Sequence, residues 1–251
     1  MGEVVQYYLH NNEYSIICLN RPNKRNAISE KMVEELNRYV VRARQDSIKC
    51  LLITGADPMF CAGGDLNDLH GDMTADEAFA TLYPMKEVLY NIAAFPVPTI
   101  CLLNGDALGG GCELATACDF RLAKEGTRFG FIQSRLGIVP GWGGGTLLYE
   151  KVQPDFAYEW LIRAETYDAS FLYERGWIHQ IIPYEQWDNI DTYLQPYLAI
   201  SYEQAQHFKQ QYQKRISIQT LSAQMDDEVR QCAQLWGREQ HKAYIHKTLR
   251  K

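Results

Sequence analysis

The sequence predicts an α/β fold, in which helices pack against a sheet of largely buried strands. Short apolar runs typical of strands alternate with stretches whose apolar residues recur every three or four positions, as they do in amphipathic helices. Glycine-rich loops follow two of the predicted strands, at 60–65 and 107–111. In α/β proteins, loops at the ends of strands often carry the functional site.

Composition limits the class of protein. The chain has 251 residues, 46% hydrophobic and 22% charged, which suffices for one large core or for one core with a small appendage. Its net charge of -6 argues against nucleic acid as a partner. The seven cysteines form no CxxC pair, which indicates reduced thiols. Neither a signal peptide nor an apolar run of about 20 residues is recognisable, so we expect a cytoplasmic protein with no membrane partner.

The first elements expected are a β-hairpin, a helix and a strand. Two β-rich runs, 4–10 and 14–20, flank a turn signal and predict the hairpin. A basic loop follows at 21–27, and Ser29 is then expected to cap an amphipathic helix. The run 49–54 predicts a buried strand that leads into the first glycine loop.

The middle of the chain is expected to add a long helix and another strand. Residues 66–74 are polar and irregular, which predicts a mobile loop. Residues 75–94 have helical spacing, and Pro84 is expected to kink or split that helix. The apolar run 99–103 predicts a buried strand that ends at the second glycine loop.

After about residue 146 the chain is expected to be mainly helical. Short extended pieces at 120–123 and 128–131 precede this part. Within it, one strand is predicted at 177–182. The predicted helices are 156–163, 169–175, 187–199, 201–214 and 221–236. We place a soft boundary that divides an α/β core, 1–195, from a C-terminal helical region, 196–251. That region is expected to pack against its own core or a neighbouring subunit.

The two glycine loops suggest a site for an oxyanion. Three glycines, 109–111, stand directly before an apolar segment that contains one carboxylate, Glu113. A helix that begins there directs unpaired N–H groups at whatever lies above it. If the two preceding strands are neighbours, one N–H from each loop can meet at a single oxygen atom and stabilise its charge. The alternative is that the glycines only permit tight turns.

Several blocks of the sequence resemble the crotonase, or enoyl-CoA hydratase/isomerase, superfamily. They are Phe60-x-Ala62-Gly63-x-Asp65, Asn104-Gly105-x-Ala107-x-Gly109-Gly110-Gly111-x-Glu113-Leu114, Asp119 with Phe129-Gly130, and Gly137-x-x-Pro140-Gly141-x-Gly143-Gly144. The resemblance implies a crotonase-like spiral of repeated ββα units with a C-terminal helical region. It also implies acyl-CoA thioester substrates, no cofactor beyond the coenzyme A of the substrate, and a homotrimer or hexamer.

The resemblance assigns roles by position. It implies that the backbone N–H groups of Ala62 and Gly110 form the oxyanion hole and that Glu113 is the general acid/base, with a pKa raised by apolar neighbours. The residues implied in binding coenzyme A are Lys24, Arg25, Ala27, Ala62, Asp65 and Leu66. For Glu113 the alternative is a buried carboxylate in an ion pair or at a helix start, and for the basic loop it is a solvated surface.

One position departs from the hydratase pattern. Hydratases of this superfamily use two glutamates, and the second position falls on Gln133. An amide cannot exchange a proton as a carboxylate does, although it can orient water or substrate. Water addition by two matched carboxylates is therefore in question.

Shorter matches point to one branch of the superfamily. Residues 116–122, 137–144 and Leu235-Trp236-Gly237 resemble the ethylmalonyl-CoA decarboxylase branch. In that case Trp142 and Trp236 would wall the acyl pocket, and the alternative for both is ordinary aromatic core packing.

Three functions remain open at this point. The first is an acyl-CoA enzyme of the hydratase/isomerase type that stabilises a thioester enolate and uses Glu113 as acid/base. The second is a decarboxylase of a short branched malonyl-CoA ester, and the third is a non-catalytic member that binds acyl-CoA. We expect no metal site, because His241 and His246 are five residues apart and do not share a helical face.

Overall fold

A six-stranded sheet forms the centre of the molecule. The structure is a computed structural model that describes residues 2–11, 13–66 and 73–249. The strands lie in the order β1-β2-β3-β4-β6-β9, with β1 antiparallel to β2 and the other neighbours parallel. Their bounds are β1 (Val5–His10), β2 (Tyr14–Leu19), β3 (Cys50–Gly55), β4 (Thr99–Leu103), β6 (Phe120–Lys124) and β9 (Gln180–Ile182). A second sheet contains β5 (Ala107–Leu108), β7 (Arg128–Gly130) and β8 (Tyr167–Asp168).

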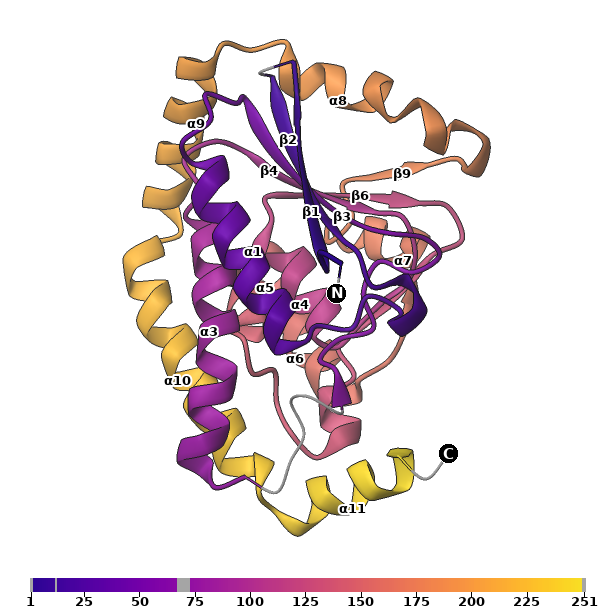
Figure 1. Cartoon of the computed structure of the whole chain (residues 1–251), viewed down its shortest axis with the longest axis vertical. Helices are drawn as coiled ribbons and strands as arrows, with labels where there is room; N and C mark the ends of the chain where they lie inside the picture. The colour runs from indigo at the N-terminus through magenta and orange to yellow at the C-terminus, as the bar shows by residue number, and fades with distance from the viewer. Residues whose placement is uncertain (1, 12, 67–72, 250–251) are drawn as a thin grey trace.

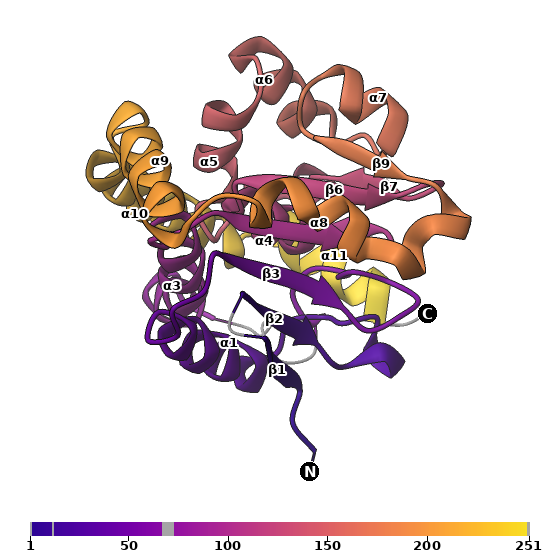
Figure 2. The same ribbon diagram turned by 90° about the horizontal axis from the view of Figure 1, so that it is seen from above.

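The helices surround these sheets (Figure 1, Figure 2). They are α1 (Glu30–Ala43), α3 (Ala75–Ala93), α4 (Gly110–Ala117), α5 (Gly144–Lys151), α6 (Pro154–Arg163), α7 (Ala169–Glu174), α8 (Ile190–Leu198), α9 (Tyr202–Arg215), α10 (Ile218–Trp236) and α11 (Glu239–Leu249). Short 3-10 helices are η1 (Pro22–Lys24), η2 (Gln133–Leu136) and η3 (Tyr184–Asn189). The expected α/β class is confirmed.

Most predicted elements are present, and a few differ. The hairpin is confirmed, and Ser29 caps α1 by accepting a hydrogen bond from the Met32 N–H at 3.3 Å. Pro84 lies inside α3, which continues through it. The helix expected at 187–199 begins only at Ile190, because η3 precedes it. Helices α5 and α11 were not predicted, and most of the loop expected at 66–74 lies outside the described residues.

Alternate residues of the strands face two apolar layers. Leu51 and Ile53 of β3 belong to the main core, which α1, α3 and α4 complete. Leu52, between them, belongs to a second layer that α8 covers through Leu194 and Leu198. Figure 1 accordingly places α8 at the top of the molecule, away from α4 and α5. This two-residue period, with both faces buried, is typical of a mostly parallel sheet between helices.

The C-terminal helices pack against the same core as the strands. Helix α10 runs alongside α3 (Figure 1), and its Met225 and Val229 are fully buried in the main core. Between these helices the buried Lys86 contacts Asp226 at 2.6 Å and the Ser222 hydroxyl at 2.9 Å. Region 196–251 was expected to pack against its own core or a neighbouring subunit. In the structure it packs against its own core.

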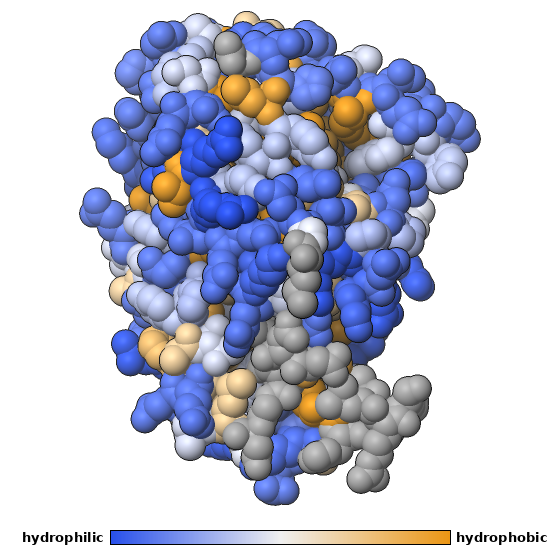
Figure 3. Space-filling model, viewed as in Figure 1, coloured by the Kyte–Doolittle hydropathy of each residue, from blue (hydrophilic) through white to orange (hydrophobic). Residues whose placement is uncertain are grey.

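The visible surface is mainly polar. On the face shown in Figure 3, hydrophobic residues form small separate patches among hydrophilic ones. Within the described ranges, the chain has no helix long and apolar enough to cross a membrane.

Candidate active site

The two glycine loops lie side by side. Cys61 and Ala107 form a parallel β-bridge, and the Leu108 N–H donates to the Cys61 carbonyl at 3.0 Å. A Cβ on Gly63 would lie 3.4 Å from the Gly110 nitrogen, so the backbones approach closely where glycine permits it. The expected convergence of both loops at one edge of the sheet is confirmed.

A cavity of about 230 Å³ opens where the loops meet. Gly64 and Gly110 line it on the loop side, and Glu113 lies at its base. Its apolar wall includes Trp142 and Trp236, both buried with 4% of their surface exposed. Both tryptophans therefore line the cavity, and their role as walls of an acyl pocket stays a prediction.

One of the two expected oxyanion donors needs correction. The Ala62 N–H donates to the Arg25 carbonyl at 3.0 Å and is therefore committed within the protein. Among the residues that the structure describes, the N–H groups of Gly64 and Gly110 have no hydrogen-bond acceptor, and both residues line the cavity. The unpaired donors thus come from Gly64 and Gly110.

Glu113 accepts hydrogen bonds from the loop before α5 and from the first residue of that helix. It lies in the first turn of α4 with 2% of its surface exposed. One carboxylate oxygen accepts from the Gln133 amide at 2.9 Å and the Gly141 N–H at 3.4 Å. The other accepts from the N–H groups of Trp142 at 2.9 Å and Gly144 at 3.0 Å. Burial raises the pKa of the Glu113 carboxyl, and these hydrogen bonds oppose that rise.

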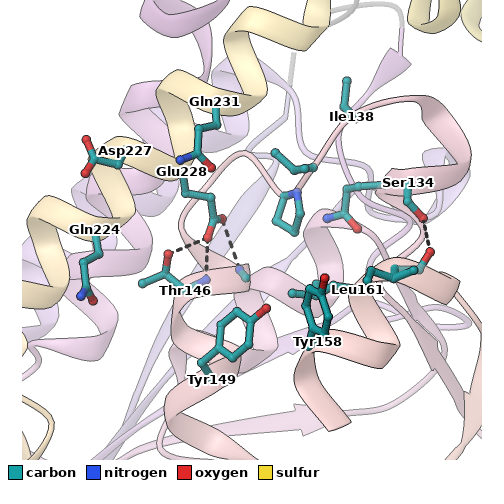
Figure 4. A pocket seen from close by; sticks show the side chains of 15 residues that line it. Ser134, Ile138, Thr146, Tyr149, Tyr158, Leu161, Gln224, Asp227, Glu228 and Gln231 are labelled. Atoms are coloured by element: carbon teal, nitrogen blue, oxygen red, sulfur yellow. Dashed lines mark hydrogen bonds between the residues drawn. The ribbon is translucent and has the colours of Figure 1, made fainter. Parts of the chain in front are cut away.

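A second buried carboxylate, Glu228 of α10, binds the same helix start and was not predicted. It accepts from the Gly145 N–H at 3.2 Å and the Thr146 hydroxyl at 2.7 Å (Figure 4). Burial and the nearby charge of Glu113 raise the pKa of Glu228 to about 8. A sequence signal was available, because Glu228 directly precedes Val229 in the apolar stripe of α10.

Glu228 lies in a separate cavity of about 500 Å³, shown in Figure 4. Three residues, Gln133, Ile138 and Val139, line both this cavity and the candidate active site, so they form the partition between them. Within the described part of the chain, the buried side-chain oxygen of Gln133 has no hydrogen-bond partner. Among the described residues, the Gln133 amide is therefore held only by the hydrogen bond that its nitrogen donates to Glu113.

The residues expected to bind coenzyme A divide into two groups. Arg25, Ala62 and Leu66 line the cavity. Asp65 is 6% exposed and forms an ion pair with Arg21 at 2.9 Å. Asp65 therefore helps to fix the loop, and its direct contact with coenzyme A stays a prediction.

The other two expected residues belong to the same basic loop, beside the cavity. Lys24 ends η1 and is exposed, and Ala27 accepts a hydrogen bond on its carbonyl from the Arg21 guanidinium at 2.6 Å. Neither is among the described residues that line the cavity.

Two asparagines that position the loops were not predicted. The buried Asn26 amide donates to the Met59 carbonyl at 2.6 Å, which joins the basic loop to the first glycine loop. Asn104 donates to Asp57 at 3.0 Å and accepts from the Gly55 N–H at 3.1 Å. In the sequence Asn104 stands directly before Gly105, whereas Asn26 lies in the basic loop and carries no sign of this role. In the described part of the chain, no cluster of three or more His, Cys, Asp or Glu residues could hold a metal ion.

Comparisons with known proteins identify the family of this chain. The family model described as enoyl-CoA hydratase/isomerase matches residues 10–249. Ethylmalonyl-CoA decarboxylase from Xenopus laevis is 39% identical over 134 residues, which cover 53% of this chain and 44% of that protein. The 2,3-dehydroadipyl-CoA hydratase from Escherichia coli is 36% identical over 170 residues, 67% of this chain and 65% of that protein. The chain spans about half the length of the ethylmalonyl-CoA decarboxylases that it matches.

The fold is shared with solved members of the same group. The crystal structure of an enoyl-CoA hydratase/isomerase from Xanthobacter autotrophicus Py2 superposes with a TM-score of 0.90 at 22% identity, covering 100% of this chain and 94% of that one. The expected crotonase-like fold is confirmed. With a family model that matches nearly its whole length, this chain belongs to the enoyl-CoA hydratase/isomerase family.

Proposed function

We propose that this protein binds an acyl-CoA thioester and stabilises the enolate of that thioester. The observation that carries the proposal is the pair of unpaired N–H groups, Gly64 and Gly110, from two adjoining loops on one cavity wall. Two fixed donors lower the energy of a developing oxyanion without having to reorganise, and each is worth roughly 3 kcal/mol. The substrate needs no further cofactor, because its coenzyme A is the handle and its thioester is the reacting group.

Within that class, the geometry favours decarboxylation of a short branched malonyl-CoA ester. In this reaction the bond between Cα and the free carboxylate breaks, CO2 leaves, and the electron pair moves into the thioester enolate. A proton from water or a protein group then adds to Cα. The bond-breaking step needs an oxyanion hole and no general base.

The surroundings of Glu113 support this choice. Each of its oxygens already accepts two hydrogen bonds, so no acceptor site remains for an attacking water. The position of the second hydratase glutamate is Gln133, whose amide cannot take up or release a proton as a carboxylate does. The apolar wall that includes Trp142 and Trp236 suits a short alkyl branch.

Hydration or isomerisation with Glu113 as acid/base is the second candidate. Glu113 lines the cavity, and burial raises its pKa toward the range in which a carboxyl group exchanges protons near neutrality. This reaction requires Glu113 to release at least one of its hydrogen bonds when substrate enters.

Parallel incubations test the two candidates. We expect the purified protein to release CO2 from ethylmalonyl-CoA or methylmalonyl-CoA and to leave the enone absorbance of crotonyl-CoA unchanged. Loss of enone absorbance that is faster than CO2 release would contradict the decarboxylase. If the protein binds coenzyme A esters and turns over none of them, it is a non-catalytic acyl-CoA-binding member.

We also infer from the family resemblance that the chain assembles into homotrimers or hexamers. Light scattering coupled to size-exclusion chromatography tests this inference directly. A monomer at micromolar concentration would contradict it.

A further inference from the structure

A third cavity lies at the opposite ends of the strands from the candidate active site. A cavity of about 330 Å³ opens beside Pro98, directly before β4, and beside Asp119 and Arg121 at the start of β6. The candidate active site lies where the glycine loops follow β3 and β4. The two cavities share no lining residue.

This cavity carries an excess of positive charge. Its buried charged side chains are three cations, Arg121, Lys151 and Lys209, and one carboxylate, Asp119, all at most 8% exposed. With all four ionised, the set has a net charge of +2, three positive minus one negative. The other lining carboxylate, Glu150, belongs to an exposed residue.

The single carboxylate is only partly satisfied, because within the described residues its buried Oδ1 has no hydrogen-bond partner. One Asp119 oxygen is bound to Lys209 and also accepts from the Thr99 N–H at 2.9 Å. The Lys151 ammonium is 3.9 Å from the other Asp119 oxygen and contacts the Tyr212 hydroxyl at 3.1 Å. Lys151 thus forms an ion pair with Asp119 at 3.9 Å, which is longer than a hydrogen bond.

Arg121 also retains donor capacity. Its Nε donates to the Trp177 carbonyl at 2.5 Å and its Nη1 to the Cys118 carbonyl at 2.8 Å. Within the described ranges its Nη2 is buried and has no hydrogen-bond partner. Buried donors on a cation are costly to leave unsatisfied.

Two further titratable side chains that line the cavity, His179 and Tyr212, add no negative charge. Burial, together with the charges of Arg121 and Lys151, lowers the pKa of His179 to about 3, so the ring is neutral at physiological pH. Burial raises the pKa of Tyr212, which keeps its hydroxyl neutral. Phe120 supplies an apolar surface beside these groups.

We propose that this cavity binds a small anion through a carboxylate or phosphate group held by Lys151, Lys209 and Arg121. An anion would offset the buried positive charge and accept charge-assisted hydrogen bonds from the free ammonium and guanidinium donors. The aromatic walls suit an organic body attached to the anionic group.

Titration of acetate, benzoate and inorganic phosphate into the full chain at fixed ionic strength tests the proposal. We expect saturable binding of at least one probe with one site per chain. Lys151→Met should weaken that binding about tenfold or more, because it removes a charge-assisted hydrogen bond. Tighter binding of benzoate than acetate would indicate an organic carboxylate as occupant, and tighter binding of phosphate would indicate a phosphate-bearing one.

The matched control is Lys214→Met. Lys214 is exposed on α9, the helix that carries Lys209, and the substitution changes the net charge of the protein equally. It should leave probe affinity unchanged. Equal loss in both variants, or no saturable binding to the wild-type chain, would overturn the proposal.

The pH dependence of binding tests the proposal without any variant. Burial lowers the pKa of Lys151 to about 8, although Asp119 opposes that effect. Because an anion binds the charged ammonium, affinity should fall as the pH rises above about 8. Probe affinity that stays constant between neutral pH and pH 9 would argue against Lys151 as the binding group.

Discussion

Glu113 illustrates how a residue can be placed correctly from sequence while its task stays open. Its position on α4 and its burial agree with what the sequence predicts. Its four hydrogen bonds could not be predicted from the sequence, because three of the donors are backbone N–H groups about thirty residues later in the chain. Those bonds make Glu113 a positioning residue for the loop that carries Trp142. In the second candidate reaction it is also the proton carrier.

Two substitutions separate these tasks. Glu113→Ala leaves four buried donors without an acceptor and should lower the free energy of unfolding by about 2–5 kcal/mol. Glu113→Gln keeps one acceptor oxygen and should be the more stable of the two. If Glu113 only positions α5, the Gln variant keeps decarboxylation within about tenfold of wild type. If it carries the proton, turnover should drop by about 10²–10⁴-fold.

Denaturant titration and CO2 release, measured on the same preparations, give both readouts. Glu174→Gln, an exposed change of the same charge on α7, is the control and should alter neither. An Ala variant as stable as wild type would contradict the positioning role.

Glycine is needed at position 110 because the Trp142 ring lies against it, in addition to the role of its N–H group. A Cβ at this position would lie 2.0 Å from the Trp142 ring, at the atom Cζ3. Gly110→Ala should therefore displace the Trp142 ring, cost about 1–3 kcal/mol of stability and abolish turnover.

The double variant Gly110→Ala with Trp142→Phe tests the stated cause. Phenylalanine lacks the outer ring atoms that the new methyl group would meet, so it should restore most of the lost stability, as thermal unfolding would measure. If the double variant is no more stable than Gly110→Ala alone, contact with Trp142 is not the reason for the glycine.

At the scale of elements, α5 shows what tertiary contacts add to sequence preference. Its start, Gly143 to Gly145, has low helix propensity, and no helix was predicted there. In the fold, Glu113 from α4 and Glu228 from α10 accept hydrogen bonds from its first turns. The helix therefore depends on carboxylates that are distant in sequence, whereas α1, with its own Ser29 cap and apolar stripe, was predicted from local residues.

This arrangement should make the stability of the folded chain depend on pH. The pKa of Glu228 is about 8 in the folded chain and near the ordinary value of 4.5 when unfolded. Between these values the folded state binds more protons than the unfolded state, so stability should fall as the pH rises from about 5 to 8. Glu228→Gln removes the titration, and the free energy of unfolding of the variant should depend less on pH across that window.

Chemical denaturation at several pH values measures this difference. Asp227→Asn, the neighbouring exposed acid on α10, removes the same charge and should keep the wild-type slope. Parallel curves for wild type and Glu228→Gln would show that Glu228 does not titrate in this range.

For the molecule as a whole, the sequence predicted layers and loops better than contacts. The apolar runs and glycine blocks located β3, β4 and both loops, because those signals are local. The expectation of Ala62 as an oxyanion donor does not fit the structure, because its N–H pairs with the Arg25 carbonyl across the fold. The cationic cavity likewise joins side chains from β6, α5 and α9, which no local pattern relates.

The predicted boundary at residue 195 leads to a test of how far the core extends. Residues 196–251 contribute the buried Met225, Val229 and Cys232 to the main core, together with Glu228 at the start of α5. A chain of residues 1–195 should therefore lack a cooperative thermal transition by calorimetry or near-UV circular dichroism. A chain of residues 1–238 keeps α9 and α10 and should retain such a transition at a lower temperature, because it loses the contact of His241 with the Leu136 carbonyl at 2.8 Å. If residues 1–195 alone unfold cooperatively near the temperature of the full chain, the C-terminal region is a separate domain rather than part of one core.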